Sequence, residues 1–275
     1  MVLNPMKVKD YVTLGNILGG LASMVAATEG NLDWACYWMI IAWIFDSVDG
    51  LVARLTGGGN KFGEVFDNVA DLVAYSLAPS FVVYLAYHLP QAQGGAGWSI
   101  WPAAALASIP TVFGCIRFAR NNVKDIIMPE FHLGLPRTVY ALYIATLFTS
   151  HLFQGPWMRD PGFLVNRVMY AAATVFILAT SYLVLTMRPY HAKPKRNSNT
   201  RGFVVFSVVW FLGTSALSFL LGWLLREPRL FFDMSAINFT VYVWFQHLFI
   251  PRDKQQRIDE YVTRIAREFR EEQVS

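Results

Sequence analysis

Four aspartates interrupt an otherwise apolar stretch in the first third of the chain. Asp46 and Asp49 are three residues apart, and Asp67 and Asp71 are four residues apart. Side chains at these spacings lie on one face of a helix. The segment between the two pairs contains three consecutive glycines, which favour a turn. We therefore expect two antiparallel helices on which the four carboxylates converge.

Convergent carboxylates in an apolar chain require a cation, because unpaired buried charge is very costly. Hard oxygen ligands favour Mg²⁺, Mn²⁺ or Ca²⁺ over zinc, and neither Cys nor His occurs in this stretch. The sequence thus predicts a divalent-metal site. Beside it, Gly50 and Ala53 leave the helix surface without bulk, so that a flat ligand fits there. Arg54 adds a positive charge suited to phosphate.

The hydrophobic content of the chain, 55% of 275 residues, is too high for an ordinary soluble domain and indicates a polytopic membrane protein. We expect an all-α fold with about eight spans of roughly 20 residues, the length that crosses about 30 Å of hydrocarbon. Pro79 is expected to kink the third span. The expected spans begin near Tyr11, Leu32, Glu64, Gly97, Leu133, Phe163, Gly202 and Leu230.

Most lysines and arginines between the expected spans fall on one side of this topology. The positive-inside rule assigns that side to the cytoplasm. Both chain ends and the glycine connector are then cytoplasmic, so that the aspartates open toward cytosolic substrates from the cell inner membrane. The net charge of +4 reflects this distribution and gives no indication of nucleic-acid binding, although a basic face attracts anionic lipid.

The aspartates belong to a longer pattern, Asp46-x2-Asp49-Gly50-x2-Ala53-Arg54-x8-Gly63-x3-Asp67-x3-Asp71. All eight fixed positions and every spacing resemble the signature of the CDP-alcohol phosphotransferases, which are membrane enzymes of phospholipid synthesis. The resemblance implies a six-helix catalytic core, a CDP-linked lipid as donor and assembly as a homodimer. It covers residues 1–190, and residues 191–250 are expected to add two further spans.

The resemblance also implies roles for the residues of this pattern. Asp46, Asp49 and Asp67 are expected to hold Mg²⁺ or Mn²⁺. Asp71, also a candidate metal ligand, is the expected general base that takes the proton from the attacking hydroxyl. The CDP moiety is expected to contact Asp49, Gly50, Ala53, Arg54, Gly63 and Asp67.

Further stretches resemble one group within this family, the CDP-diacylglycerol-serine O-phosphatidyltransferases. They are IRFARNN followed by FHLGLP, the segment FGEVFDNVADLVAYSLAPS, and Thr13, Asn16 and Gly20 in the first expected span. The likeness implies CDP-diacylglycerol and L-serine as substrates, with phosphatidylserine and CMP as products. In that group, small residues and a second proline usually follow GLP, whereas Arg137-Thr138-Val139-Tyr140 follows here. Glycerol 3-phosphate, inositol 1-phosphate or another alcohol therefore stay open as acceptors, and an ether lipid stays open as donor.

Three arginines lie near the expected cytoplasmic boundary. Arg117 and Arg120 are three residues apart at the end of the fourth expected span, and Arg137 is one turn inside the fifth. An arginine within a span requires an anionic partner. We expect these arginines to bind the lipid phosphate or the anionic group of the acceptor. For Arg117 and Arg120, positive-inside topology or snorkelling is an equally good explanation.

Residues 251–275 form an expected cytoplasmic tail helix with one apolar face. It packs on the domain, lies on the membrane surface or contacts a second copy. A cation transporter is the alternative reading of the aspartates from another class of protein. That reading predicts charges near the bilayer midplane on broken helices, whereas the aspartates cluster at the cytoplasmic ends of their spans.

Overall fold

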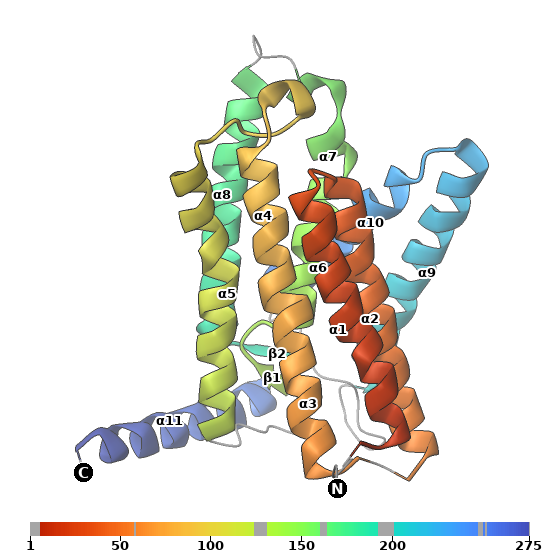
Figure 1. Ribbon diagram of the computed structural model, residues 1–275. Coiled ribbons are helices and arrows are strands. Elements are labelled where there is room, and N and C mark those ends of the chain that lie inside the picture. Colours follow the sequence, from red (N-terminus) through yellow and green to blue (C-terminus); the bar gives the residue numbers. More distant parts are fainter. Residues whose placement is uncertain are drawn as a thin grey trace, which may run out of the picture.

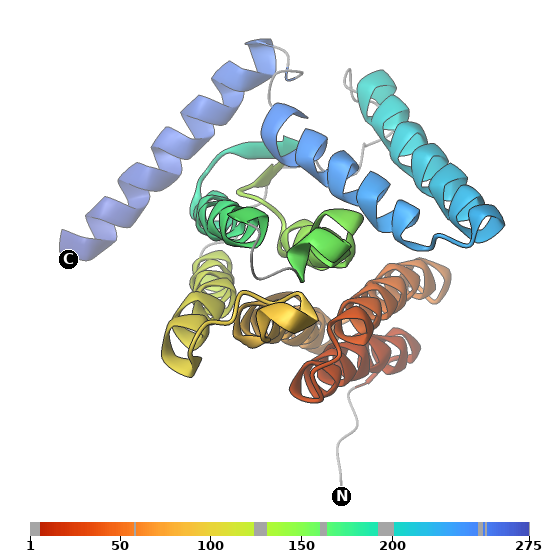
Figure 2. The same cartoon turned by 90° about the horizontal axis from the view of Figure 1, so that it is seen from above.

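Long helices that run up and down side by side form the main body of the protein (Figure 1). Figure 2 shows α9 and α10 at one side of this bundle, with α11 crossing beside it. The computed structural model describes residues 6–57, 59–123, 131–159, 164–191, 201–246, 250 and 252–274. The long helices are α1 (Val8–Thr28), α2 (Leu32–Leu55), α3 (Lys61–Leu72), α4 (Ala78–His88), α5 (Ile100–Val123), α6 (Arg137–Thr149), α8 (Leu164–Leu185), α9 (Arg201–Leu225), α10 (Arg229–Phe245) and α11 (Arg252–Val274). The short elements are η1 (Val73–Leu77), η2 (Gln91–Gln93), α7 (His151–Gln154), η3 (Pro156–Met158), β1 (Phe131–Leu133) and β2 (Pro189–His191).

Five helical segments are long and apolar enough to cross a membrane: α1, α2, α3 through α4, α5 and α8. The protein is therefore a multi-pass membrane protein, and five of the eight expected spans are confirmed. The other three expected spans correspond to α6, which has 13 residues, to α10, which has 17, and to α9, which contains the apolar segment Val209–Leu225. α6 is mostly buried inside the bundle.

The predicted all-α fold is confirmed, with one short sheet that the sequence did not predict. β1 and β2 form a two-stranded antiparallel sheet, in which Phe131 lies opposite His191. Strands of three residues are too short to give a periodic pattern, so the sequence did not predict them. The sheet joins the start of α6 to the end of α8, and Ile258 of α11 packs against Phe131 and Leu133.

Glycines on α1 allow this helix to approach its neighbours very closely. A Cβ atom on Gly19 would lie 2.8 Å from the Cβ of Ala42 on α2. A Cβ atom on Gly20 would lie 2.9 Å from the Cα of Ala74 in η1. The small-residue face of the first span is therefore a packing face, as membrane helices commonly use. It brings the polar side chains of α1 against α2 and η1.

The third span contains a turn of π-helix rather than a simple kink at Pro79. η1 follows Asp71 by two residues, and the Ala78 N–H at its end donates to the carbonyl of Val73. Pro79 has no N–H to donate to the carbonyl one helical turn before it, and the widened turn ends just ahead of it. Turns of this kind occur frequently at functional sites.

The start of α1, the end of α2, the start of α3 and α11 all lie at the same end of the bundle (Figure 1). The first and last helices and the glycine connector thus share one side, as the topology predicted. The assignment of that side to the cytoplasm stays a prediction.

Candidate active site

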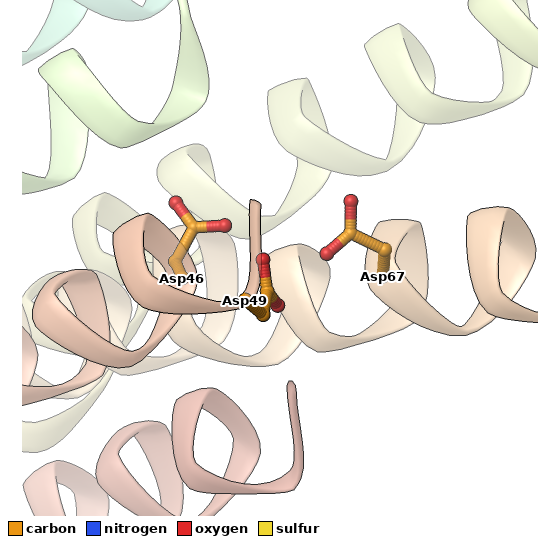
Figure 3. Close-up of side chains that lie close together, drawn as sticks. All are labelled: Asp46, Asp49 and Asp67. Carbon is orange, nitrogen blue, oxygen red and sulfur yellow. The ribbon is translucent and has the colours of Figure 1, made fainter. Parts of the chain in front are cut away.

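Three of the four aspartates converge. Asp46 and Asp49 come from α2 and Asp67 comes from α3, and each offers an oxygen within 4.8 Å of the others. Figure 3 shows the three side chains pointing toward a shared space between the two helices. Asp49 is buried, and the other two are half-buried. The helical spacing and the turn between the helices therefore produce the predicted cluster at these three positions.

This three-carboxylate cluster fits a divalent cation. Its donor atoms are all carboxylate oxygens, which hard ions such as Mg²⁺ and Mn²⁺ prefer. The Oδ1 atom of Asp67 is buried and has no hydrogen-bond partner among the residues that the structure describes. A buried anionic oxygen without a donor requires compensation from elsewhere. A cation among Asp46, Asp49 and Asp67 would supply that compensation.

Hydroxyl groups from two other elements orient the aspartates of α2. The Thr13 hydroxyl on α1 donates to Asp49 Oδ2 at 2.6 Å. The Tyr75 hydroxyl in η1 donates to Asp46 Oδ2 at 3.1 Å. Thr13 and Tyr75 are both fully buried. Thr13 had been noted only through the family resemblance, and Tyr75 had not been identified from the sequence at all.

Asp71 lies outside the three-carboxylate cluster and has partners of its own. Its Oδ2 atom is 3.5 Å from Arg137 Nη2, and its Oδ1 atom accepts a hydrogen bond from Asn16 Nδ2 at 3.4 Å. Arg137 is the first residue of α6, directly after Pro136. Arg137 was expected to have an anionic partner within its span, and that partner is Asp71. Binding of a substrate by Arg137 stays a prediction.

Arg117 and Arg120 join α5 to neighbouring backbone. Arg117 is buried, and its Nη1 donates to the carbonyls of Leu135 at 2.8 Å and Val184 at 2.9 Å. Arg120 Nη1 donates to the carbonyl of Leu185 at 2.6 Å. Val184 and Leu185 lie at the C-terminal end of α8, where cations are favoured, and Leu135 precedes α6. The structure thus gives both arginines a packing function, and their predicted contact with substrate is untested.

Two of these arginines keep buried donor atoms free. Arg120 Nη2 and Arg137 Nη1 have no hydrogen-bond partner among the described residues. The same holds for Oδ1 of Asn16, whose side chain is fully buried. An unsatisfied buried polar group costs about 1–3 kcal/mol. Donors and an acceptor in this state are therefore suited to a ligand.

The residues expected at the CDP moiety lie in two different environments. A Cβ atom on Gly50 would meet open space, and beside it Arg54 is exposed, with its Nε donating to the Gly50 carbonyl at 2.9 Å. Ala53 on the same helix is half-buried. A Cβ atom on Gly63 would instead lie 2.5 Å from Asp10 Oδ1 and 2.8 Å from Lys9 Cε. Gly50 thus borders free space, whereas Gly63 admits the start of α1.

Lys9 and Asp10 form a buried ion pair that was not predicted as part of the site. Their side chains are 3.2 Å apart, and Lys9 Nζ also donates to the Gly63 carbonyl at 3.1 Å. Asp10 is fully buried. The pair fixes the start of α1 on the start of α3. In the sequence, two adjacent charged residues ahead of an apolar span are typical of a segment at the membrane interface. No local pattern indicates that Lys9 and Asp10 are buried.

Comparison with known proteins identifies the family. The CDP-alcohol phosphatidyltransferase family matches residues 6–180, which include all four aspartates and all three arginines. The chain therefore belongs to the CDP-alcohol phosphatidyltransferase family. α9, α10 and α11 lie outside the matched part.

Individual relatives share about a third of the aligned residues. The CDP-diacylglycerol-serine O-phosphatidyltransferase of Helicobacter pylori is 32% identical over 146 residues, which are 52% of this chain and 58% of that protein. A protein with the same name from Methanocaldococcus jannaschii is 36% identical over 137 residues, or 50% of this chain and 58% of that protein. The archaetidylserine synthase of Methanothermobacter thermautotrophicus is 32% identical over 160 residues, or 55% of this chain and 64% of that protein. The chain thus spans less than two thirds of the length of each of these relatives.

Proposed function

We propose that this protein transfers the phosphatidyl group of CDP-diacylglycerol to the hydroxyl of L-serine, giving phosphatidylserine and CMP. The observation that carries the proposal is the three-carboxylate cluster with Asp71 beside it. Family membership and the names of the relatives support it. We further propose that the site faces the cytoplasm from the cell inner membrane and that the protein acts as a homodimer.

The proposed reaction uses Asp46, Asp49 and Asp67 as ligands of Mg²⁺ or Mn²⁺. The bound metal would offset negative charge on the diphosphate and on the departing CMP. Asp71 accepts the proton of the acceptor hydroxyl while the hydroxyl oxygen forms a bond to the phosphorus that carries the lipid. The bond from this phosphorus to the CMP oxygen breaks, and CMP leaves with the electron pair. The position of Asp71 outside the cluster favours this role over that of a ligand.

The contacts around Asp71 hold its carboxylate in one orientation, which suits a general base. Arg137 contacts one carboxylate oxygen and Asn16 the other, so that rotation of the carboxylate is restricted. A positioned base contributes far more than a mobile one, because the geometry of proton transfer is fixed beforehand.

The unsatisfied polar atoms near Asp71 support an amino acid as acceptor. L-Serine carries a carboxylate and an ammonium group next to its hydroxyl. Arg137 Nη1 is a free donor of the kind that binds carboxylates, and Asn16 Oδ1 is a free acceptor for an ammonium group.

The CDP moiety is proposed to lie along the open surface of α2. Gly50 and Ala53 offer a helix face without bulk, and Arg54 provides an exposed positive charge for phosphate. Gly63 would contribute through its backbone, because its α-carbon is already covered by Lys9 and Asp10.

The test is release of CMP by the purified protein in detergent. CDP-diacylglycerol and Mn²⁺ or Mg²⁺ are supplied, and L-serine, glycerol 3-phosphate and inositol 1-phosphate are offered separately. We expect turnover with serine that stops when EDTA removes the metal and returns when the metal is restored. Turnover only with a phosphorylated acceptor would assign the arginines to phosphate. Release of no CMP with any acceptor, by protein that still binds Mn²⁺, would contradict the proposed function.

A parallel assay separates two donor classes. One relative is named archaetidylserine synthase, so a CDP-linked ether lipid is tested against CDP-diacylglycerol at equal concentration. We expect the ester-linked donor to give the higher kcat/KM. A higher kcat/KM with the ether lipid would make the ether lipid the donor and would leave the proposed reaction unchanged.

A further inference from the structure

Tyr75 is an unusual residue for the middle of an apolar span. Its side chain is fully buried, and its hydroxyl donates to Asp46 Oδ2 at 3.1 Å. Phenylalanine would fill nearly the same volume without a polar atom to satisfy. The hydroxyl is therefore not required for packing, and its partner is a member of the three-carboxylate cluster.

We propose that Tyr75 is a positioning residue for the metal centre, which holds the Asp46 carboxylate in place toward Asp49 and Asp67. The inference rests on the metal site of the proposed function but not on the identity of the lipid or the acceptor. Groups that hydrogen-bond to metal ligands fix ligand orientation, and their loss typically lowers metal affinity about 10- to 100-fold.

Each of the two aspartates of α2 accepts a hydrogen bond from a hydroxyl group on a different neighbouring element. Thr13 on α1 donates to Asp49, and Tyr75 in η1 donates to Asp46. Asp67 on α3 differs, since its Oδ1 has no partner among the described residues. Two oriented ligands and one adaptable ligand form a site whose geometry depends on Thr13 and Tyr75.

The π-helical turn explains how Tyr75 reaches Asp46. Tyr75 follows Asp71 by four residues, as Asp71 follows Asp67. In a regular α-helix, each step of four residues drifts by about 40° around the axis. A π turn takes more residues per revolution and reverses part of this drift. η1 spans Val73–Leu77 and thus keeps Tyr75 near the face that carries Asp67 and Asp71.

The test compares two tyrosine variants in direct Mn²⁺ binding, measured by the electron paramagnetic resonance signal of free Mn²⁺ without lipid or acceptor. Tyr75→Phe is expected to weaken binding about 10- to 100-fold. Tyr87→Phe is the matched control, because Tyr87 is also fully buried in the third span and its hydroxyl donates to the carbonyl of Tyr170 at 2.9 Å. It is expected to bind Mn²⁺ as the unaltered protein does.

A second comparison shows whether Tyr75 acts through Asp46. In the Asp46→Ala background, which lacks the acceptor, Tyr75→Phe is expected to cause no further loss of Mn²⁺ affinity. Equal affinities of the Tyr75→Phe and unaltered proteins would overturn the proposal. So would a metal-free Tyr75→Phe protein that unfolds at a much lower temperature than Tyr87→Phe, because the hydroxyl would then serve the fold. Neither readout depends on CMP release, so failure here and failure of the proposed reaction are distinguishable.

Discussion

The aspartate end of the bundle is built on contacts between buried polar side chains, whereas the α9–α10 pair presents an exposed apolar surface. At the aspartate end, buried polar side chains contact one another across three elements, as Thr13 and Tyr75 do with the carboxylates. α9 packs against α10 and exposes large apolar side chains, among them Trp210, Phe219 and Trp223. In a membrane protein such a surface faces lipid. We therefore expect that chemistry is confined to the first part of the chain, where the family matches, and that the α9–α10 pair adds membrane-embedded surface.

The most severe test of this comparison is Asp71→Asn. The amide keeps the shape of the side chain but cannot take a proton from the acceptor hydroxyl, so kcat should fall by about 10²–10⁴-fold. Binding of CDP-diacylglycerol, measured by equilibrium titration, should persist. Near-normal turnover with intact donor binding would remove Asp71 from the role of general base.

An intermediate effect should separate Arg137 from Arg117. Arg137→Gln removes the guanidinium beside Asp71, and the KM for serine should rise about 10- to 100-fold, as expected for loss of a hydrogen bond to a charged group worth about 1.5–3 kcal/mol. Arg117→Gln instead leaves the carbonyls of Leu135 and Val184 without their donor, so its main effect should be a lower unfolding temperature.

Steady-state kinetics and thermal unfolding of both arginine variants provide the check. The expected pattern is a larger rise in KM for Arg137→Gln and a larger fall in unfolding temperature for Arg117→Gln. The reverse pattern would show that Arg117 faces the substrate and that Arg137 serves the fold.

The smallest effect is expected in the α9–α10 pair. Asn238 is buried on α10, and its Nδ2 donates to Thr214 Oγ1 on α9 at 2.8 Å. Asn238→Leu should cost about 0.6 kcal/mol, the average for a hydrogen bond between membrane helices. Unfolding in mixed micelles measures this cost. Serine turnover should not change, and a large loss of kcat would show that the pair contributes to the site.

The sequence was sufficient to predict convergence of Asp46, Asp49 and Asp67, because helical spacing and a glycine turn act locally. The sequence could not show which of Arg117 and Arg137 contacts an aspartate and which binds backbone carbonyls. Both lie at the same expected boundary, and their partners are far away in the chain. Tyr75 was missed because its direction depends on a π turn. The β1–β2 sheet was missed because each strand pairs with a segment nearly 60 residues away, at Phe131 and His191.

The close approach of α1 to η1 has a consequence for the geometry of the proposed metal site. Gly20 lies against the backbone of Ala74, and there is no room for a methyl group between them. Asn16 is one helical turn before Gly20, and Ala74 directly precedes Tyr75. The clearance between these two backbones therefore sets how near the amide of Asn16 and the hydroxyl of Tyr75 come to the carboxylates that they contact.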